Sequence, residues 1–88
     1  MDQAVNAYAM LYAVHADKLI DVWPSIEGYV EKALEHTDVL TSDDVFDAIS
    51  DKRMQCFVVG KPIIGVVVTE IAPYPQKTIL RVVVLAIS

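Results

Sequence analysis

The side chains that could do chemistry are few in this sequence and lie far apart along it. His15 and His36 are 21 positions apart, with no Cys or carboxylate around them at the spacing of zinc ligands. Cys56, the single cysteine, alternates with Met54 and Val58 in an apolar segment, and no base is evident beside it to make a nucleophile. We therefore predict a packed core thiol, no catalytic residue, no metal site and no bound cofactor.

The remaining polar candidates have structural interpretations. Gly60-Lys61 is expected at a hairpin tip, because the full phosphate-loop pattern is absent. Five Asp residues between positions 38 and 51 fit a capped helix better than a calcium loop. Glu70 is expected at the solvent-facing end of a strand rather than as a catalytic base. Arg81, a cation inside an apolar strand, is either an edge-strand gatekeeper or a partner for Glu70 across a hairpin.

Composition limits the classes of protein. Eighty-eight residues make one domain, and 55% of them are hydrophobic, an excess that needs a core or a partner. Residues 1–51 carry eleven acids and two lysines (−9), whereas residues 52–88 carry five bases and one acid (+4). This split indicates a solvated acidic helical surface beside a basic sheet, or attraction between copies or to a basic partner.

Several partners and compartments are disfavoured by the same composition. No basic stripe with interleaved aromatics is present, so we expect no nucleic acid. The apolar run at residues 4–14 is short and contains Asn6, so we expect neither a signal peptide nor a membrane span. A lone cysteine favours a reducing compartment, and hence the cytoplasm.

Helical signals occupy the first half of the chain, after an N-terminal extension at residues 1–9. Residues 10–15 are predicted as a short strand, with a helix continuous with residues 3–9 as the alternative. Asp17 or Asp21 could cap the first long helix. Pro24 favours a start at Asp21, with residues 17–20 as a separate turn, because proline is tolerated only within a first turn. Its apolar face is expected to comprise Trp23, Ile26, Val30, Ala33 and Leu34.

The next helix has the clearest start in the chain. Thr41 is a good N-cap, and Asp44 three residues later completes a variant of the capping box. Leu40 and Val45 are placed to form a hydrophobic staple across the first turn. The residues expected to face inward are Val45, Ala48 and Ile49.

Strand signals occupy the second half. Residues 54–59, 63–71 and 78–87 are rich in Val, Ile and Leu and are separated by short turns at residues 60–62 and 72–77. Short turns make such strands antiparallel neighbours. Gly65 is expected at a bulge or at a close backbone approach. We therefore predict an α+β domain: a short N-terminal strand, two helices on one face, and a three-stranded antiparallel meander.

From Met10 onward the chain resembles the N-terminal half of GNAT-fold proteins, the acyl-CoA N-acyltransferase superfamily, and especially the small GNAT-like proteins of tailed phages. The segments that carry the resemblance are Val22-Trp23-Pro24, Ala33-Leu34, Thr41-Ser42-Asp43-Asp44-Val45, Met54-Gln55-Cys56-Phe57-Val58-Val59, Val68-Thr69-Glu70-Ile71 and Tyr74-Pro75-Gln76-Lys77. It implies a single half-GNAT-like domain over residues 10–88.

The resemblance also implies a missing half. In the GNAT fold, a Gly-rich turn and helix after the fourth strand hold the pyrophosphate of acyl-CoA. This sequence stops at Ser88, where that strand would end, so no cofactor-binding residue carries over. We therefore expect no acetyl transfer by this chain alone, unless a second chain supplies the acyl-CoA-binding half.

The last strand is the predicted contact with a partner. Its two alternating sets are both apolar: Ile79, Val83, Leu85 and Ile87 on one side, and Leu80, Val82, Val84 and Ala86 on the other. We expect two short helices to cover only one face, and the final strand to leave an open edge. The predicted interface residues are Ile79, Arg81, Val82, Val83, Val84, Leu85 and Ile87.

These observations lead to one main hypothesis and two alternatives. The main one is a non-catalytic interaction or structural protein that completes its sheet with a protein partner or further copies of itself. A phage virion or assembly component is its most concrete version, which would place the chain in the host cytoplasm or in a particle. The alternatives are an N-terminal fragment of an acyltransferase and a small acidic inhibitor-type binding protein.

Overall fold

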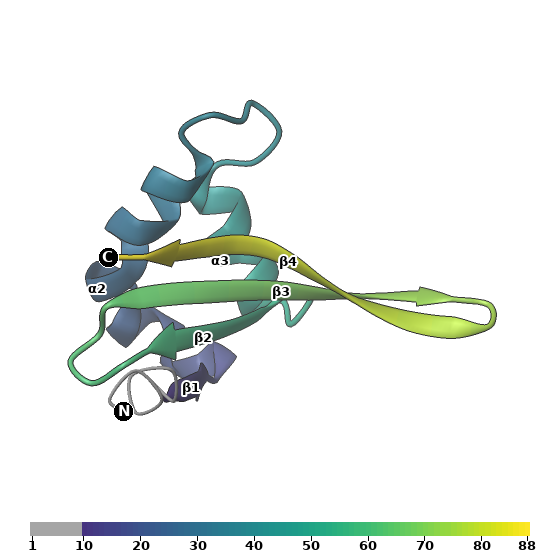
Figure 1. Ribbon diagram of the computed structural model, residues 1–88, viewed down its shortest axis with the longest axis horizontal. Helices are drawn as coiled ribbons and strands as arrows, with labels where there is room; N and C mark the ends of the chain where they lie inside the picture. The colour runs from purple at the N-terminus through teal and green to yellow at the C-terminus, as the bar shows by residue number, and fades with distance from the viewer. Residues whose placement is uncertain (1–9) are drawn as a thin grey trace, which may run out of the picture.

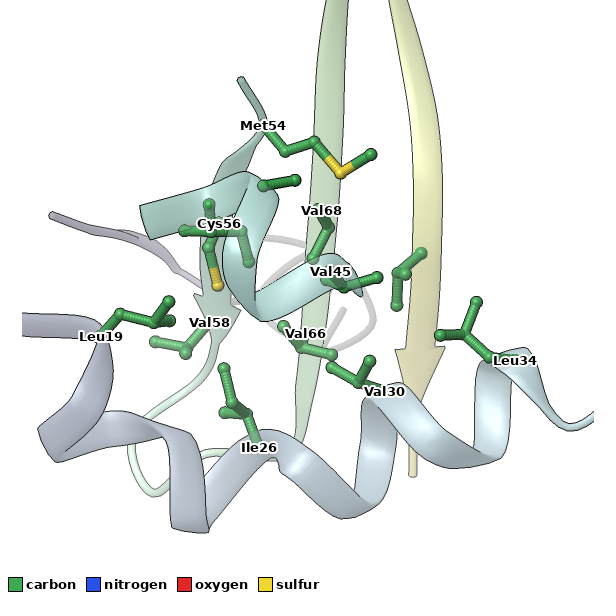
Figure 2. Close-up of a cluster of buried hydrophobic side chains, with 13 residues drawn as sticks. Leu19, Ile26, Val30, Leu34, Val45, Met54, Cys56, Val58, Val66 and Val68 are labelled. Atoms are coloured by element: carbon green, nitrogen blue, oxygen red, sulfur yellow. The ribbon is translucent and has the colours of Figure 1, made fainter. Parts of the chain in front are cut away.

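The computed structural model describes residues 10–88, and the predicted extension at residues 1–9 lies outside the described residues. The elements in chain order are β1 (Leu11–Val14), the 3-10 turn η1 (Ala16–Lys18), α2 (Leu19–Leu34), α3 (Ser42–Ser50), β2 (Gln55–Val59), β3 (Gly65–Tyr74) and β4 (Lys77–Ile87). Both helices lie on the same face of the sheet (Figures 1 and 2). The described chain is therefore a two-layer α+β structure, as the sequence predicts.

The sheet has four antiparallel strands in the order β1-β2-β3-β4. It therefore has four strands rather than the three of the predicted meander, because the short N-terminal strand joins it beside β2. Leu11 pairs with Val59, and Val14 pairs with Cys56. The strand interpretation of residues 10–15 is confirmed over Leu11–Val14, and the helical alternative for these residues is excluded. Within the described residues, β1 and β4 form the two edges of the sheet.

Helix α2 begins earlier than the sequence predicts. It starts at Leu19, directly after η1, so Pro24 lies inside the helix rather than in its first turn. Proline has no N–H for the carbonyl four residues earlier, at Ile20. Pro24 and Ile20 are both exposed, where water can compensate for the missing bond. The buried face of α2 consists of Leu19, Ile26, Val30 and Leu34. Placing Ala33 on that face was wrong, because Ala33 is exposed.

Helix α3 begins where its capping signal predicts. The Thr41 hydroxyl accepts the Asp44 N–H at 3.2 Å, and the Asp44 carboxylate accepts the Thr41 N–H at 2.9 Å. These two bonds satisfy backbone donors that an isolated helix start leaves open. The predicted inward residues Val45, Ala48 and Ile49 are all buried. A purely local signal therefore determines the position of this helix.

The β3–β4 hairpin is longer than the sequence predicts. The turn expected at residues 72–77 shortens to Pro75-Gln76, because Tyr74 and Lys77 still pair with each other. The far end of the hairpin projects well past both helices (Figure 1). The register shifts between Val68 and Thr69, which oppose Val84 and Val82, so a β-bulge leaves Val83 without a direct partner. The bulge does not lie at Gly65, which instead marks a close backbone approach to Ala86.

One hydrophobic core lies between the helices and the sheet (Figure 2). Helix α2 contributes Leu19, Ile26 and Val30, and α3 contributes Val45 and Ile49. The strands contribute Cys56, Val58, Val66, Val68 and Val84. Most of the stability of so small a domain comes from burying this apolar surface. The opposite sheet face, here called the outer face, is covered by neither helix.

Candidate functional site

The bulge decides which β4 side chains share a face. Because Val83 is the extra residue, Val83 and Val84 both pack against the core, and the alternation of the strand changes phase between them. The strict alternation expected from the sequence was therefore wrong. Directly opposed residues of an antiparallel pair point to the same face. The side chains of β4 on the outer face are Thr78, Leu80, Val82, Leu85 and Ile87.

Five apolar side chains make up an exposed strip on this face. The outer patch consists of Ile71, Leu80, Val82, Leu85 and Ile87, which are between 51% and 63% exposed. The register supports one shared face, since Ile71 opposes Leu80 and Gly65 opposes Ile87. An apolar strip of this kind is uncommon on a protein that works alone.

No charged side chain of the described strands lies on the outer face. Glu70 and Arg81 oppose each other on the helix side of the hairpin, and their side chains are joined at 2.7 Å. Two polar side chains of the outer face, Thr69 and Gln55, are bonded to each other. The Thr69 hydroxyl donates to Gln55 Oε1 at 3.1 Å, across the β2–β3 pair. Covering this face would therefore bury no charge.

The backbone of β4 offers a second feature, an edge that no other strand of residues 10–88 pairs with. Ser88 N–H donates to the Ile64 carbonyl at 2.8 Å, just beyond the paired residues Gly65 and Ile87. Hydrogen-bonded and non-bonded pairs alternate along an antiparallel ladder. Ile87 and Leu85 thus fall in non-bonded pairs and direct their N–H and C=O groups away from β3. Such groups are a template for an added strand.

A groove runs beside that edge. It has a volume of about 340 Å³ and lies between α2 and the end of β4. Its walls are Tyr29, Lys32 and Ala33 from the helix and Leu85, Ala86, Ile87 and Ser88 from the strand end. The Tyr29 hydroxyl lies 3.4 Å from Ser88 Oγ at this end of the groove. Sequence reasoning missed the groove because it assigned Ala33 to the core.

The predicted interface residues are distributed over three environments. Val82, Leu85 and Ile87 are exposed on the outer patch, and Ile79 and Arg81 are exposed on the other side of the hairpin. Val83 is half-buried against the core, and Val84 is only 1% exposed within it. The structure thus brings three of the seven residues together on one face, and contact with a partner stays a prediction.

The most chemically suggestive cavity is a different one, near β1. It has a volume of about 340 Å³, and its lining includes His15, Lys52 and Cys56. Burial raises the pKa of the Cys56 thiol to about 11, so the thiol keeps its proton near neutral pH. A nucleophilic cysteine needs a thiolate. The arrangement therefore fits the predicted core thiol better than a catalytic dyad.

The other candidates are also accounted for within the chain. His36 is exposed, with Nε2 3.7 Å from Glu35 Oε1. Asp44 is engaged in the helix cap described above. Over residues 10–88, no cluster of three or more His, Cys, Asp or Glu side chains is arranged to hold a metal ion. In the same part of the chain, no helix combines the length and the apolar character needed to cross a membrane.

Comparison with known proteins adds no assignment. Neither a family model, nor a curated protein, nor a solved structure matches this chain.

Proposed function

We propose that this chain is a non-catalytic interaction protein that associates with other protein chains through its last strand, β4. Following the sequence resemblance, we further propose a GNAT-like half-fold in a phage virion or assembly component. The single observation that carries the proposal of association is the outer patch, five exposed apolar side chains on one uncharged face.

Covering the outer patch is favourable because it removes apolar surface from water. Burying apolar surface contributes about 25 cal/mol per Å², and the five patch residues remain more than half exposed in the single chain. Since Glu70 and Arg81 lie on the other side of the hairpin, no ionised group has to lose its hydration when the patch is covered. Association on this face is therefore favoured by the main driving force of protein–protein contact, without the usual electrostatic cost.

The edge of β4 supports the same conclusion by a separate route. A partner strand placed beside β4 could bond to the outward N–H and C=O groups of Leu85 and Ile87. Alternate side chains of that strand would enter the groove against Ala33 and Tyr29. Main-chain bonds and a side-chain groove together are the usual elements of recognition by strand addition.

The experiment compares two single substitutions by sedimentation. Leu85→Lys places a charge on the outer patch, whereas Ile20→Lys places one at a position of α2 that is 70% exposed and remote from the patch. We expect wild type and Ile20→Lys to associate with rising concentration and Leu85→Lys to remain a monomer. Circular dichroism of all three proteins checks that the fold is unchanged.

Two results would contradict the proposal. One is a Leu85→Lys protein that keeps every association of the wild type. The other is a wild type that remains a monomer at high micromolar concentration with the same solubility limit as Leu85→Lys. The acyltransferase alternative is tested separately by calorimetric titration with acetyl-CoA. Saturable binding in the micromolar range would favour an enzyme.

A further inference from the structure

The groove beside β4 lies where a strand added to the sheet would place its side chains. Helix α2 passes behind the end of β4 and continues past its edge (Figure 1). A strand paired with the outward N–H and C=O groups of Leu85 and Ile87 would lie about 4.8 Å from β4. Alternate side chains of that strand would then point toward α2 and enter the groove. The position of the groove therefore favours an extended segment as its ligand.

The walls of the groove are mainly apolar. Ala33 of α2 is exposed, and its methyl group leaves room opposite Ala86 and Ile87 of the strand. The Tyr29 hydroxyl lies 3.4 Å from Ser88 Oγ, so its polar tip has a partner within the chain. An aliphatic side chain can therefore enter without leaving a polar group of the groove unpaired.

Lys32 adds a positive charge to the groove, on a helix that is otherwise acidic. The acids of α2 are Asp21, Glu27 and Glu31, and none of them lines the groove, whereas Lys32 does. Among residues 10–88, no acidic side chain lies within 4.0 Å of the Lys32 amine. A carboxylate on the ligand would therefore find a cation here and no competing acid in the groove wall.

The spacing of these two features determines the pattern of the ligand. Tyr29 and Lys32 are three residues apart on α2 and are therefore neighbours on its surface. Same-face side chains of an extended segment are two residues apart, a distance of about 6.6 Å. An aliphatic side chain beside Ala33 and Tyr29 thus places the next side chain of the same face near Lys32.

We propose that the groove binds an extended segment of a partner protein in which a large aliphatic residue and an acidic residue are two positions apart. The segment pairs with β4 through its main chain, the aliphatic side chain fills the groove and the carboxylate binds Lys32. This inference rests on the proposed function, association through β4, and adds the chemistry of the partner.

The test selects nine-residue peptides from a random display library on the immobilised full chain. Counter-selection uses Ala33→Gln, a neutral substitution that fills the groove at an exposed helix position. Fluorescence polarisation then gives the dissociation constant of each selected peptide for the wild type, Ala33→Gln and Lys32→Glu. Lys61→Glu is the matched control, because it makes the same charge change at an exposed residue that does not line the groove. Circular dichroism checks that all four proteins fold.

We expect the selected peptides to share a large aliphatic residue two positions from an aspartate or glutamate. Their dissociation constants should rise at least about tenfold on Ala33→Gln and on Lys32→Glu, and stay unchanged on Lys61→Glu. A second selection on Lys32→Glu should replace the acidic residue by lysine or arginine, because repulsion has replaced attraction at that position.

A library that yields no peptide sensitive to Ala33→Gln overturns this inference. Peptides that bind Lys32→Glu as tightly as the wild type overturn it as well, because the groove would then not select a carboxylate. Either result leaves the proposed function standing when Leu85→Lys abolishes association, with the outer patch as the contact. The proposed function fails separately, when Leu85→Lys leaves every association of the chain and its solubility unchanged.

Discussion

Glu70 and Arg81 face each other across the β3–β4 hairpin, with 2.7 Å between Glu70 Oε1 and Arg81 Nη2. The pair lies just beyond the bulge, on the side of the hairpin that leads to the Pro75-Gln76 turn. Of the two interpretations of Arg81 from the sequence, pairing with Glu70 is confirmed. The arginine also lies on an edge strand, so its charge interrupts an otherwise apolar segment.

This ion pair is partly exposed, so its contribution to stability should be small. We expect Arg81→Met to lower the free energy of unfolding by about 0.2–1 kcal/mol, an effect that high salt should remove. A double-mutant cycle with Glu70→Gln in urea isolates the interaction between the two side chains. A coupling energy of zero at low salt would show that the 2.7 Å contact contributes nothing in solution.

Trp23 packs against Phe46 rather than at the centre of the core. Their ring centroids are 5.0 Å apart at an interplanar angle of 78°, an edge-to-face contact between α2 and α3. Truncation of a fully buried Trp costs about 3–5 kcal/mol, and Trp23 is half-buried, so we expect Trp23→Ala to approach the lower end of that range. Thermal unfolding measures the loss. Trp23→Phe should retain most of the stability, and an Ala variant that melts like the wild type would contradict this role.

Two glycines give a matched pair of opposite predictions. A Cβ on Gly65 would lie 2.5 Å from the Ala86 carbonyl oxygen, so Gly65→Ala must push β3 and β4 apart. We expect a loss of about 1–3 kcal/mol. A Cβ on Gly28 in α2 would meet nothing within 4 Å, and we expect Gly28→Ala to gain about 0.5–1 kcal/mol. Urea unfolding compares both with the wild type. Equal stability of the two variants would mean that the strands at Gly65 can separate without cost.

The buried thiol of Cys56 should make stability fall at high pH. Its pKa is raised from 9.0 to about 11 by burial, so between these values the folded chain holds a proton that the unfolded chain has lost. The free energy of unfolding then decreases with rising pH across this window, by up to about 2–3 kcal/mol. Below pH 9 the thiol contributes no slope, because it is protonated in both states.

The control for this prediction is Cys56→Ala, which removes the thiol and leaves every other side chain unchanged. The stability difference between wild type and Cys56→Ala, measured in urea from pH 8 to about pH 11, should shrink as pH rises. A difference that stays constant over this range would show that the thiol ionises alike in the folded and unfolded chains.

Local signals in the sequence determined helix α3 and the approximate positions of the strands. The Thr41–Asp44 capping box joins atoms only three residues apart, so the sequence predicts it without knowledge of the fold. The Val- and Ile-rich segments likewise become β2, β3 and β4, because branched apolar side chains favour a pleated, buried surface. These same segments predict the α+β class that the structure shows.

The start of α2 could not be predicted from local sequence signals. The position of Pro24 predicts a helix start at Asp21, yet α2 begins at Leu19. Leu19 is fully buried against the core, and tertiary packing therefore outweighs the single hydrogen bond lost at the proline. Such an energy balance depends on neighbours that a local pattern does not contain.

The candidate site depended most on the tertiary structure. Whether Val82 or Val83 points outward is decided by the bulge, which arises from pairing between β3 and β4 and has no signal in β4 alone. The groove beside Ala33 exists because α2 lies against the end of β4, more than fifty residues later in the chain. The sequence by itself determined that the last strand is apolar on both sides. Only the packing of the helices onto one of those sides decided which residues remain exposed to water.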